Sequence, residues 1–230
     1  MLLRPLIALL ALAAAAPAGA DLQWYYGART TLAAQQLNDT THNNTIGTGG
    51  ADGQLADTGV EDLTAGIGFV VGRDLTSVPG LRLEGELIWR YRTDWDLRSY
   101  THSIGAVTNV FSDVSTTTLM LNASTQFPLS ARWTWEMGAG VGVAVNQVDA
   151  RLVERRVGAA IQQHEQSNVA FAWGVQLGVS RPLNRNWRLG LHYRYLDLGG
   201  AEAGPFRLGG EELSADHVAH ELQLSLFRGL

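Results

Sequence analysis

Apolar and polar residues alternate strictly along residues 187–195, and this pattern recurs through the chain. The apolar positions hold Trp187, Leu189, Leu191, Tyr193 and Tyr195, and the positions between them hold arginines, a histidine and a glycine. A period of two predicts a β-strand with one apolar face, because a helix would spread these apolar residues around its whole circumference. The alternation alone leaves the orientation open. A soluble lipocalin-type barrel would bury the aromatic face, whereas a membrane barrel would turn it toward lipid.

Seven further stretches alternate in the same way, at residues 22–32, 64–72, 81–92, 117–127, 133–146, 169–179 and 222–226. Most are close to the roughly 9–11 residues that a tilted strand needs to cross a bilayer. Beyond the N-terminal segment, no stretch has the roughly 18 uninterrupted apolar residues of a transmembrane helix. If the chain spans a membrane, it must therefore do so as a closed barrel.

The predicted connections between these stretches alternate between long and short. The long ones cover residues 38–62, 93–115, 147–167 and 199–216, and the short ones cover 73–80, 128–131 and 181–186. Two short turns share a proline followed five residues later by tryptophan, at Pro128 and Trp133 and at Pro182 and Trp187. Short turns at one end and long loops at the other are typical of outer-membrane barrels. The pattern predicts an all-β, eight-stranded antiparallel up-and-down transmembrane β-barrel with short periplasmic turns and four long extracellular loops.

The distribution of aromatic residues favours the orientation in which the apolar faces meet lipid. Aromatic residues cluster near strand ends, as expected of girdles at the two membrane interfaces. Glycines such as Gly138, Gly140 and Gly142 occupy the opposite faces, which suits a lumen just wide enough for side chains. The predicted girdle residues are Trp24, Trp133, Trp135 and Trp187 at the short-turn end and Trp89, Tyr91, Tyr193 and Tyr195 toward the other end.

The polar faces carry arginines and glutamates in comparable numbers. Buried charges are tolerated only when they are paired, so a near-balanced set predicts a lumen filled by ion pairs. We expect Glu84 and Glu136 to lie at similar heights, and Glu221 to approach Arg194 or Arg29. The predicted network consists of Arg29, Arg82, Glu84, Glu86, Arg90, Arg92, Glu136, Arg188, Arg194 and Glu221.

Composition and the N-terminus indicate an exported membrane protein. Charged residues make up 17% of the chain, below the roughly 25% of an average soluble domain. There is no cysteine, which excludes disulfides and thiol chemistry, and the net charge of −5 gives no signal for nucleic acid. Residues 1–20 resemble a cleavable signal peptide, with Arg4, an apolar core and Ala18-Gly19-Ala20 before the cleavage point. The alternative, a short membrane anchor, has too short an apolar core to span a bilayer. The barrel domain would then comprise residues 21–230.

The segment Leu191-His-Tyr-Arg-Tyr-Leu-Asp-Leu-Gly199, together with the strand and loop pattern, resembles the small outer-membrane β-barrels of Gram-negative bacteria. These form the outer-membrane protein A-like and opacity-protein superfamily. The resemblance implies a bacterial outer-membrane location, contact with membrane lipid and lipopolysaccharide, insertion by the barrel-assembly machinery, and a monomer that can bind an extracellular ligand through its loops. The chain departs from the family at its end, where Leu230 rather than an aromatic residue is in phase and Phe227 faces inward.

Candidate catalytic and metal-binding residues are sparse. His102-Ser103 and the set Ser214, Asp216, His217 and His220 could form a hydrolytic site only if loops folded over the rim, and no hydrolase motif surrounds them. The acidic loop residues Asp39, Asp52, Asp57, Glu61 and Asp62 have no fixed metal-ligand spacing. We therefore expect a non-enzymatic barrel without cofactors, with a role in envelope integrity or surface interaction. The alternatives are a lipid A-modifying enzyme of the same fold and a narrow porin-like channel.

Overall fold

Ten β-strands make up the regular structure of the described residues. The computed structural model describes residues 23–43, 54–55, 60–75, 78, 80–101, 106–154, 160–204 and 212–230. No helix in this part of the chain is long and apolar enough to cross a membrane. The strands are β1 (Gln23–Asn43), β2 (Gln54–Leu55), β3 (Val60–Leu75), β4 (Leu81–Asp94), β5 (Leu97–Thr101), β6 (Ala106–Pro128), β7 (Thr134–Glu154), β8 (Ala160–Pro182), β9 (Trp187–Ala203) and β10 (Glu212–Gly229). The predicted signal peptide, residues 1–20, lies outside the described residues.

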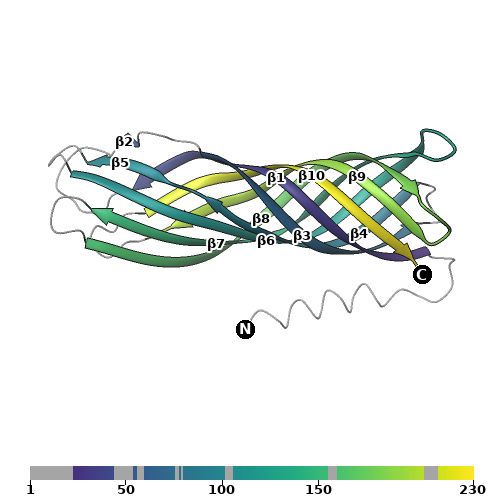
Figure 1. The fold of residues 1–230 in the computed structure, drawn as a ribbon, viewed down its shortest axis with the longest axis horizontal. Coiled ribbons are helices and arrows are strands. Elements are labelled where there is room, and N and C mark those ends of the chain that lie inside the picture. Colours follow the sequence, from purple (N-terminus) through teal and green to yellow (C-terminus); the bar gives the residue numbers. More distant parts are fainter. Residues whose placement is uncertain are drawn as a thin grey trace.

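Eight of these strands form a closed antiparallel barrel, and the fold-class prediction is confirmed. Around the wall the order is β1, β3, β4, β6, β7, β8, β9 and β10, and β10 pairs with β1 to close it. The short strand β5 pairs with residues 106–110 of β6, and β2 pairs with β5. Both lie at the end of the barrel opposite the C-terminus (Figure 1). Every pairing joins antiparallel neighbours, so the chain runs up and down the cylinder.

The predicted short turns lie together at one end of the barrel. In both Pro-to-Trp turns the tryptophan carbonyl accepts a backbone N–H, from Leu129 at 2.9 Å in one turn and from Leu183 at 2.8 Å in the other. The C-terminus lies at the same end, where the N–H of Leu230 donates to the carbonyl of Trp24 at 2.9 Å. The similar sequences of these two turns therefore reflect a shared turn conformation.

The strands reach farther from the turns than the alternating pattern predicted. Residues assigned to long connections extend β1 to Asn43, β7 to Glu154 and β8 back to Ala160. These extensions escaped prediction because their outward faces are polar, so the outward apolar pattern of the crossing stretches stops there. On β7, for example, Val148 and Ala150 are buried in the lumen while Gln147 and Arg151 are exposed.

Exposure distinguishes the two faces of the wall as predicted for a membrane barrel. Leu121 and Val141 are exposed by 58% and 52%, whereas Asn122, beside Leu121 in sequence, is only 5% exposed. Glycines allow this inner packing, because a Cβ on Gly68 would lie 2.5 Å from the side chain of Ile88 across the pair of strands. Apolar residues outside and polar residues inside are the reverse of a soluble barrel.

Candidate functional site: the lumen and the extracellular rim

A network of buried ion pairs fills the middle of the lumen. The carboxylate of Glu86, on β4, accepts hydrogen bonds from Arg29 of β1 and from Arg194 of β9, the latter at 2.5 Å. Arg29 also donates to Ser225 at 2.8 Å, and Arg194 also donates to Gln176 at 2.9 Å. All of these side chains are buried. One carboxylate therefore connects strands from opposite parts of the wall.

A second group of contacts surrounds Glu136 closer to the short-turn end. Its carboxylate accepts hydrogen bonds from Arg82 at 2.9 Å and from Ser180 at 2.5 Å, and one of its oxygens lies 2.9 Å from Nε2 of His192. Arg82 continues the network to Asp74 at 2.8 Å. Buried carboxylates are tolerable here because each finds several donors.

The ionic partner of Glu221 is neither Arg194 nor Arg29, the two that were predicted. Glu221 lies directly opposite Arg194 in the pairing of β9 and β10, yet its carboxylate accepts a hydrogen bond from Arg90 of β4 at 2.6 Å. Arg90 also donates to Thr118 at 3.0 Å, and Glu221 accepts from Gln223 at 2.9 Å. The lumen is narrow enough for an arginine to reach across it, so strand adjacency does not determine the pairs.

Two predicted network residues are placed differently from the rest. Arg92 is outside the lumen, and the prediction that it faces inward is wrong. A register shift between Arg90 and Thr93 turns Thr93 inward and leaves the Arg92 side chain 64% exposed. Arg188 lies at the short-turn mouth, where its guanidinium is 4.8 Å from the ring centre of Tyr25 and 3.8 Å from the Asp74 carboxylate.

Apolar layers close the lumen above and below the ion pairs. At the short-turn end Tyr25 and Phe227 pack edge to face with ring centres 5.4 Å apart, against Val70. Tyr25 also donates to Glu84 at 2.7 Å, joining this layer to the ionic network. At the extracellular end Trp95 is fully buried, in a cluster with Leu37, Val114, Val148, Ala150, Ala201 and Ala215. Trp95 was missed because it lies just beyond the alternating stretch at residues 81–92 and stands between two aspartates.

All eight predicted girdle residues have their side chains on the outer face of the wall. Trp89, Tyr91 and Tyr193 are exposed by 45%, 51% and 50%. At the short-turn end three tryptophans each lie beneath an arginine guanidinium, at 5.8 Å for Trp24 and Arg73, 5.6 Å for Trp133 and Arg181, and 5.8 Å for Trp187 and Arg228. Amphipathic rings beside cations are typical of a membrane interface.

The candidate catalytic residues of β10 point in different directions. His217 is fully buried in the lumen and lies 2.6 Å from the side-chain oxygen of Gln35. Ser214 is exposed on the other face and shares a hydrogen bond with Thr41 at 2.7 Å, and Asp216 is exposed as well. His220 is on the outer wall, 2.7 Å from the hydroxyl of Tyr193. The wall separates His217 from Ser214 and Asp216, so these three cannot form a hydrolytic triad. His102 and Ser103 lie outside the described residues.

Only some of the acidic residues considered as metal ligands belong to the described part of the chain. Within the described ranges, no group of three or more histidines, aspartates or glutamates could hold a metal ion. Asp39, Glu61 and Asp62 belong to this part of the chain, whereas Asp52 and Asp57 lie outside it.

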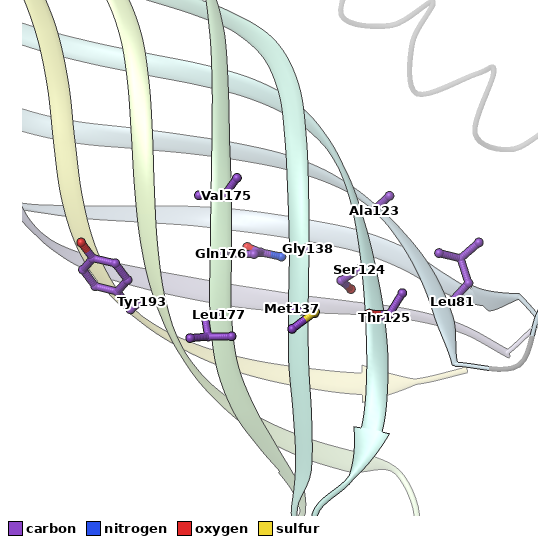
Figure 2. Close-up of a pocket in the computed structure, with 10 residues that line it drawn as sticks. All are labelled: Leu81, Ala123, Ser124, Thr125, Met137, Gly138, Val175, Gln176, Leu177 and Tyr193. Carbon is purple, nitrogen blue, oxygen red and sulfur yellow. The ribbon is translucent and has the colours of Figure 1, made fainter.

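A shallow groove of about 620 Å³ crosses the outer wall over β4, β6, β7, β8 and β9 (Figure 2). Met137, Val175, Leu177 and Tyr193 border it, and Ala123 and Gly138 leave the space because their side chains are small or absent. The groove lies within the apolar band and holds no charged side chain. This surface suits hydrocarbon rather than a polar substrate.

A closed antiparallel barrel with an apolar exterior and a charged interior identifies the architecture, and the family model for the outer membrane protein β-barrel domain matches residues 5–224. The chain belongs to this family. Members of the outer membrane protein β-barrel family are bacterial outer-membrane proteins, which gives the location of the chain. No curated protein sequence matches it significantly.

Several solved structures are similar to this chain at low sequence identity. Neisserial surface protein A is 14% identical with a TM-score of 0.48, and the match covers 89% of this chain and 96% of that one. OprG from Pseudomonas aeruginosa is 12% identical with a TM-score of 0.46, over 90% and 95% of the two chains. Ail of Yersinia pestis, solved with a heparin analogue, is 8% identical with a TM-score of 0.41, over 87% and 99%. At these identities the likeness concerns the fold alone.

Proposed function

We propose that this protein is a non-conducting, non-enzymatic outer-membrane barrel that supports envelope integrity or surface interaction through its extracellular part. In this proposal the lumen is a structural core rather than a path for solutes. The strands position an extracellular rim, and the rim and its loops contact the ligand. The outer wall contacts membrane lipid and lipopolysaccharide, and the chain acts as a monomer inserted by the barrel-assembly machinery.

The closure of the lumen carries this proposal. Tyr25 and Phe227 fill one end, Trp95 fills the other, and buried ion pairs occupy the space between them. A solute would have to displace an apolar layer and break paired charges at the same time. Breaking a buried pair costs on the order of 3–5 kcal/mol, which opposes a steady open state.

Single-channel recording in planar bilayers tests this directly. We expect no steady conductance steps from the folded protein, with insertion verified by heat-modifiable migration on gels. A known small porin, inserted under the same conditions, serves as the positive control. Ohmic conductance from the unmodified protein would instead support the narrow-channel alternative.

The enzymatic alternative has its own test. Mass spectrometry of lipid A from cells with and without the protein is expected to give the same acyl and sugar pattern. An altered pattern that is lost in the His102→Ala or His217→Ala variant would replace the non-enzymatic proposal.

A further inference from the structure

The apolar groove on the outer wall climbs around the barrel. Its border nearer the short turns consists of residues that lie directly opposite one another in successive strand pairs, namely Leu81, Thr125, Met137, Leu177 and Tyr193 (Figure 2). Leu81 is the first residue of β4 at the short-turn end, whereas Tyr193 lies well beyond Trp187, the first residue of β9. The groove therefore begins at the periplasmic side of the wall and rises into the apolar band.

Two alanines between rows of larger side chains form the floor of this groove. Ala123 of β6 lies opposite Ala139 of β7, and the next outward pair toward the extracellular end is Leu121 with Val141. The short alanine side chains leave a trough of about 620 Å³ between these rows. A narrow apolar trough of this shape allows an extended hydrocarbon chain to contact side chains on both of its flanks, which a flat wall would not.

An arginine lies beside the start of the groove. Arg73 of β3 is directly opposite Leu83 of β4, which places it next to Leu81 along the same strand pair. Its guanidinium lies 5.8 Å from the ring centre of Trp24, at the level of the short-turn girdle. Arginine binds phosphate oxygens through parallel N–H groups, and phosphates are the anionic groups of a phospholipid surface. Arg73 is therefore placed to bind the head group of a lipid whose chain enters the groove.

The outer surface at the short-turn end is positively charged. The arginines exposed or half-exposed there in the described part of the chain are Arg73, Arg132, Arg181, Arg185 and Arg228. The carboxylate next to Arg73 in sequence, that of Asp74, is bonded to the lumen arginines Arg82 and Arg188 instead. Among the described residues no aspartate or glutamate lies on this outer surface, and the C-terminal carboxylate offsets only one of the positive charges.

The extracellular end has the opposite charge. Asp113 of β6 lies opposite Asp149 of β7, and Asp149 lies opposite Glu165 of β8, with Arg92 bonded to the two aspartates. Like charges in neighbouring strands repel one another and any further anion. An anionic lipid is therefore favoured at the short-turn end of the wall and disfavoured at the extracellular end.

We propose that the outer wall binds one anionic glycerophospholipid of the inner leaflet, with its phosphate at Arg73 and one acyl chain in the groove. The chain lies across Ala123 and Ala139 and extends toward Tyr193, while Trp24 packs at the interface beside the head group. A second copy of this chain fits the groove poorly, because it would bring its own basic end against that of the first. The proposal rests on the lipid contact proposed for the outer wall and is independent of closure of the lumen.

A single fluorescent label on the groove measures which lipid occupies it. The chain has no cysteine, so the Thr125→Cys variant carries one bimane label at the border of the groove. The labelled protein is folded into vesicles that mix phosphatidylglycerol with phosphatidylcholine, one of which has brominated acyl chains that quench bimane on contact. We expect phosphatidylglycerol to be preferred by about two- to fivefold, as for an exposed charge pair. The matched control, labelled Thr30→Cys on the outer face of β1, should show no preference.

Two substitutions separate the head-group contact from the groove. Arg73→Gln in the labelled Thr125→Cys protein should abolish the preference for phosphatidylglycerol. Arg228→Gln is its control, because it removes a guanidinium that also lies 5.8 Å from a tryptophan ring at the same end, and it should leave the preference unchanged. Ala123→Leu fills the groove and should reduce the preference as well, whereas Ala28→Leu, on the outer face of β1, should not. Heat-modifiable migration verifies that each variant is folded.

Several outcomes would overturn the proposal. They are equal affinity for the two lipids at Thr125, the same preference at Thr30 as at Thr125, and an unchanged preference in the Arg73→Gln variant. Shielding of the Thr125 label from both brominated lipids, while the Thr30 label is quenched, would show that a second copy of the chain covers the groove. Absence of quenching at both positions would contradict the lipid contact of the outer wall itself, which distinguishes failure of the proposed function from failure of this site.

Discussion

Individual buried carboxylates determine how the charges inside this barrel are tolerated. Glu86 accepts hydrogen bonds from two arginines. Glu136 contacts Arg82, Ser180 and His192, and Glu221 accepts a hydrogen bond from Arg90. Such pairs add little net stability, because desolvation offsets the attraction between the charges. Removing one partner has a much larger effect, since it leaves the other charge buried and unpaired.

The Glu221→Ala variant should therefore lower the free energy of unfolding by about 3–5 kcal/mol. Arg90, which is fully buried, would lose its carboxylate. Urea unfolding in lipid vesicles, followed by tryptophan fluorescence, measures the change. Glu202→Ala, which removes an exposed carboxylate from β9, is the control and should change stability by less than about 0.5 kcal/mol. Replacing both charges, in Arg90→Met/Glu221→Leu, should recover most of the loss, and failure to recover it would contradict the explanation by an unpaired charge.

The contact between the Tyr25 hydroxyl and Glu84 can also be tested by a single substitution. The Tyr25→Phe variant keeps the ring against Phe227 but removes the hydroxyl that donates to Glu84 at 2.7 Å. We expect a loss of about 1–3 kcal/mol, because a buried carboxylate is left with one donor fewer. Tyr26→Phe, on the adjacent outward-facing residue, should have little effect in the same unfolding assay. Equal effects of the two variants would show that the Glu84 contact contributes nothing specific.

Each crossing strand has one face toward lipid and the other toward the packed lumen. On β6, Leu121 faces outward and the next residue, Asn122, faces the lumen. On β7, Val141 faces outward and Gly140 faces inward, in contact range of Asn122. A substitution therefore acts through lipid exposure at one residue and through lumen volume at its neighbour.

The Leu121→Arg variant should cost about 2–4 kcal/mol and impair insertion, because it places a charge in hydrocarbon. Gly140→Leu should also destabilise the barrel, but through overpacking against Asn122, and the loss should be smaller when Asn122→Ala is added. Folding yield in vesicles of defined lipid, read by heat-modifiable migration, separates these cases. Normal insertion of Leu121→Arg would mean that this face does not contact lipid.

The whole molecule combines a closed interior with two chemically different ends. The short-turn end carries arginines beside tryptophans, and the extracellular rim carries a row of carboxylates. Four groups of buried side chains fill the lumen. They are the Trp95 cluster, the ion pairs, Tyr25 with Phe227, and a second apolar cluster formed by Met120, Ala144, Ala172, Leu196, Leu198 and Ala219.

Opening one layer should therefore not produce a channel. We expect Trp95→Ala to remain non-conducting in planar bilayers, because the ion pairs and the Tyr25–Phe227 layer still close the lumen. Trp95→Ala/Tyr25→Ala/Phe227→Ala should show brief, irregular openings at most, since the buried pairs remain. Steady conductance from Trp95→Ala alone would show that the single apolar layer at the extracellular end is the barrier.

The sequence by itself determined the strands that cross the membrane, their two faces, the short turns and most of the charges inside the lumen. It could do so because lipid on one side and a crowded interior on the other impose a period of two on every crossing strand. Only the tertiary structure decided which charges pair, since Arg90 reaches Glu221 across the lumen and a one-residue shift on β4 turns Arg92 outward. The extracellular extensions and the buried position of Trp95 also needed the structure. Above the membrane no apolar solvent imposes a pattern, so the backbone ladders there depend on neighbours that are distant in the chain.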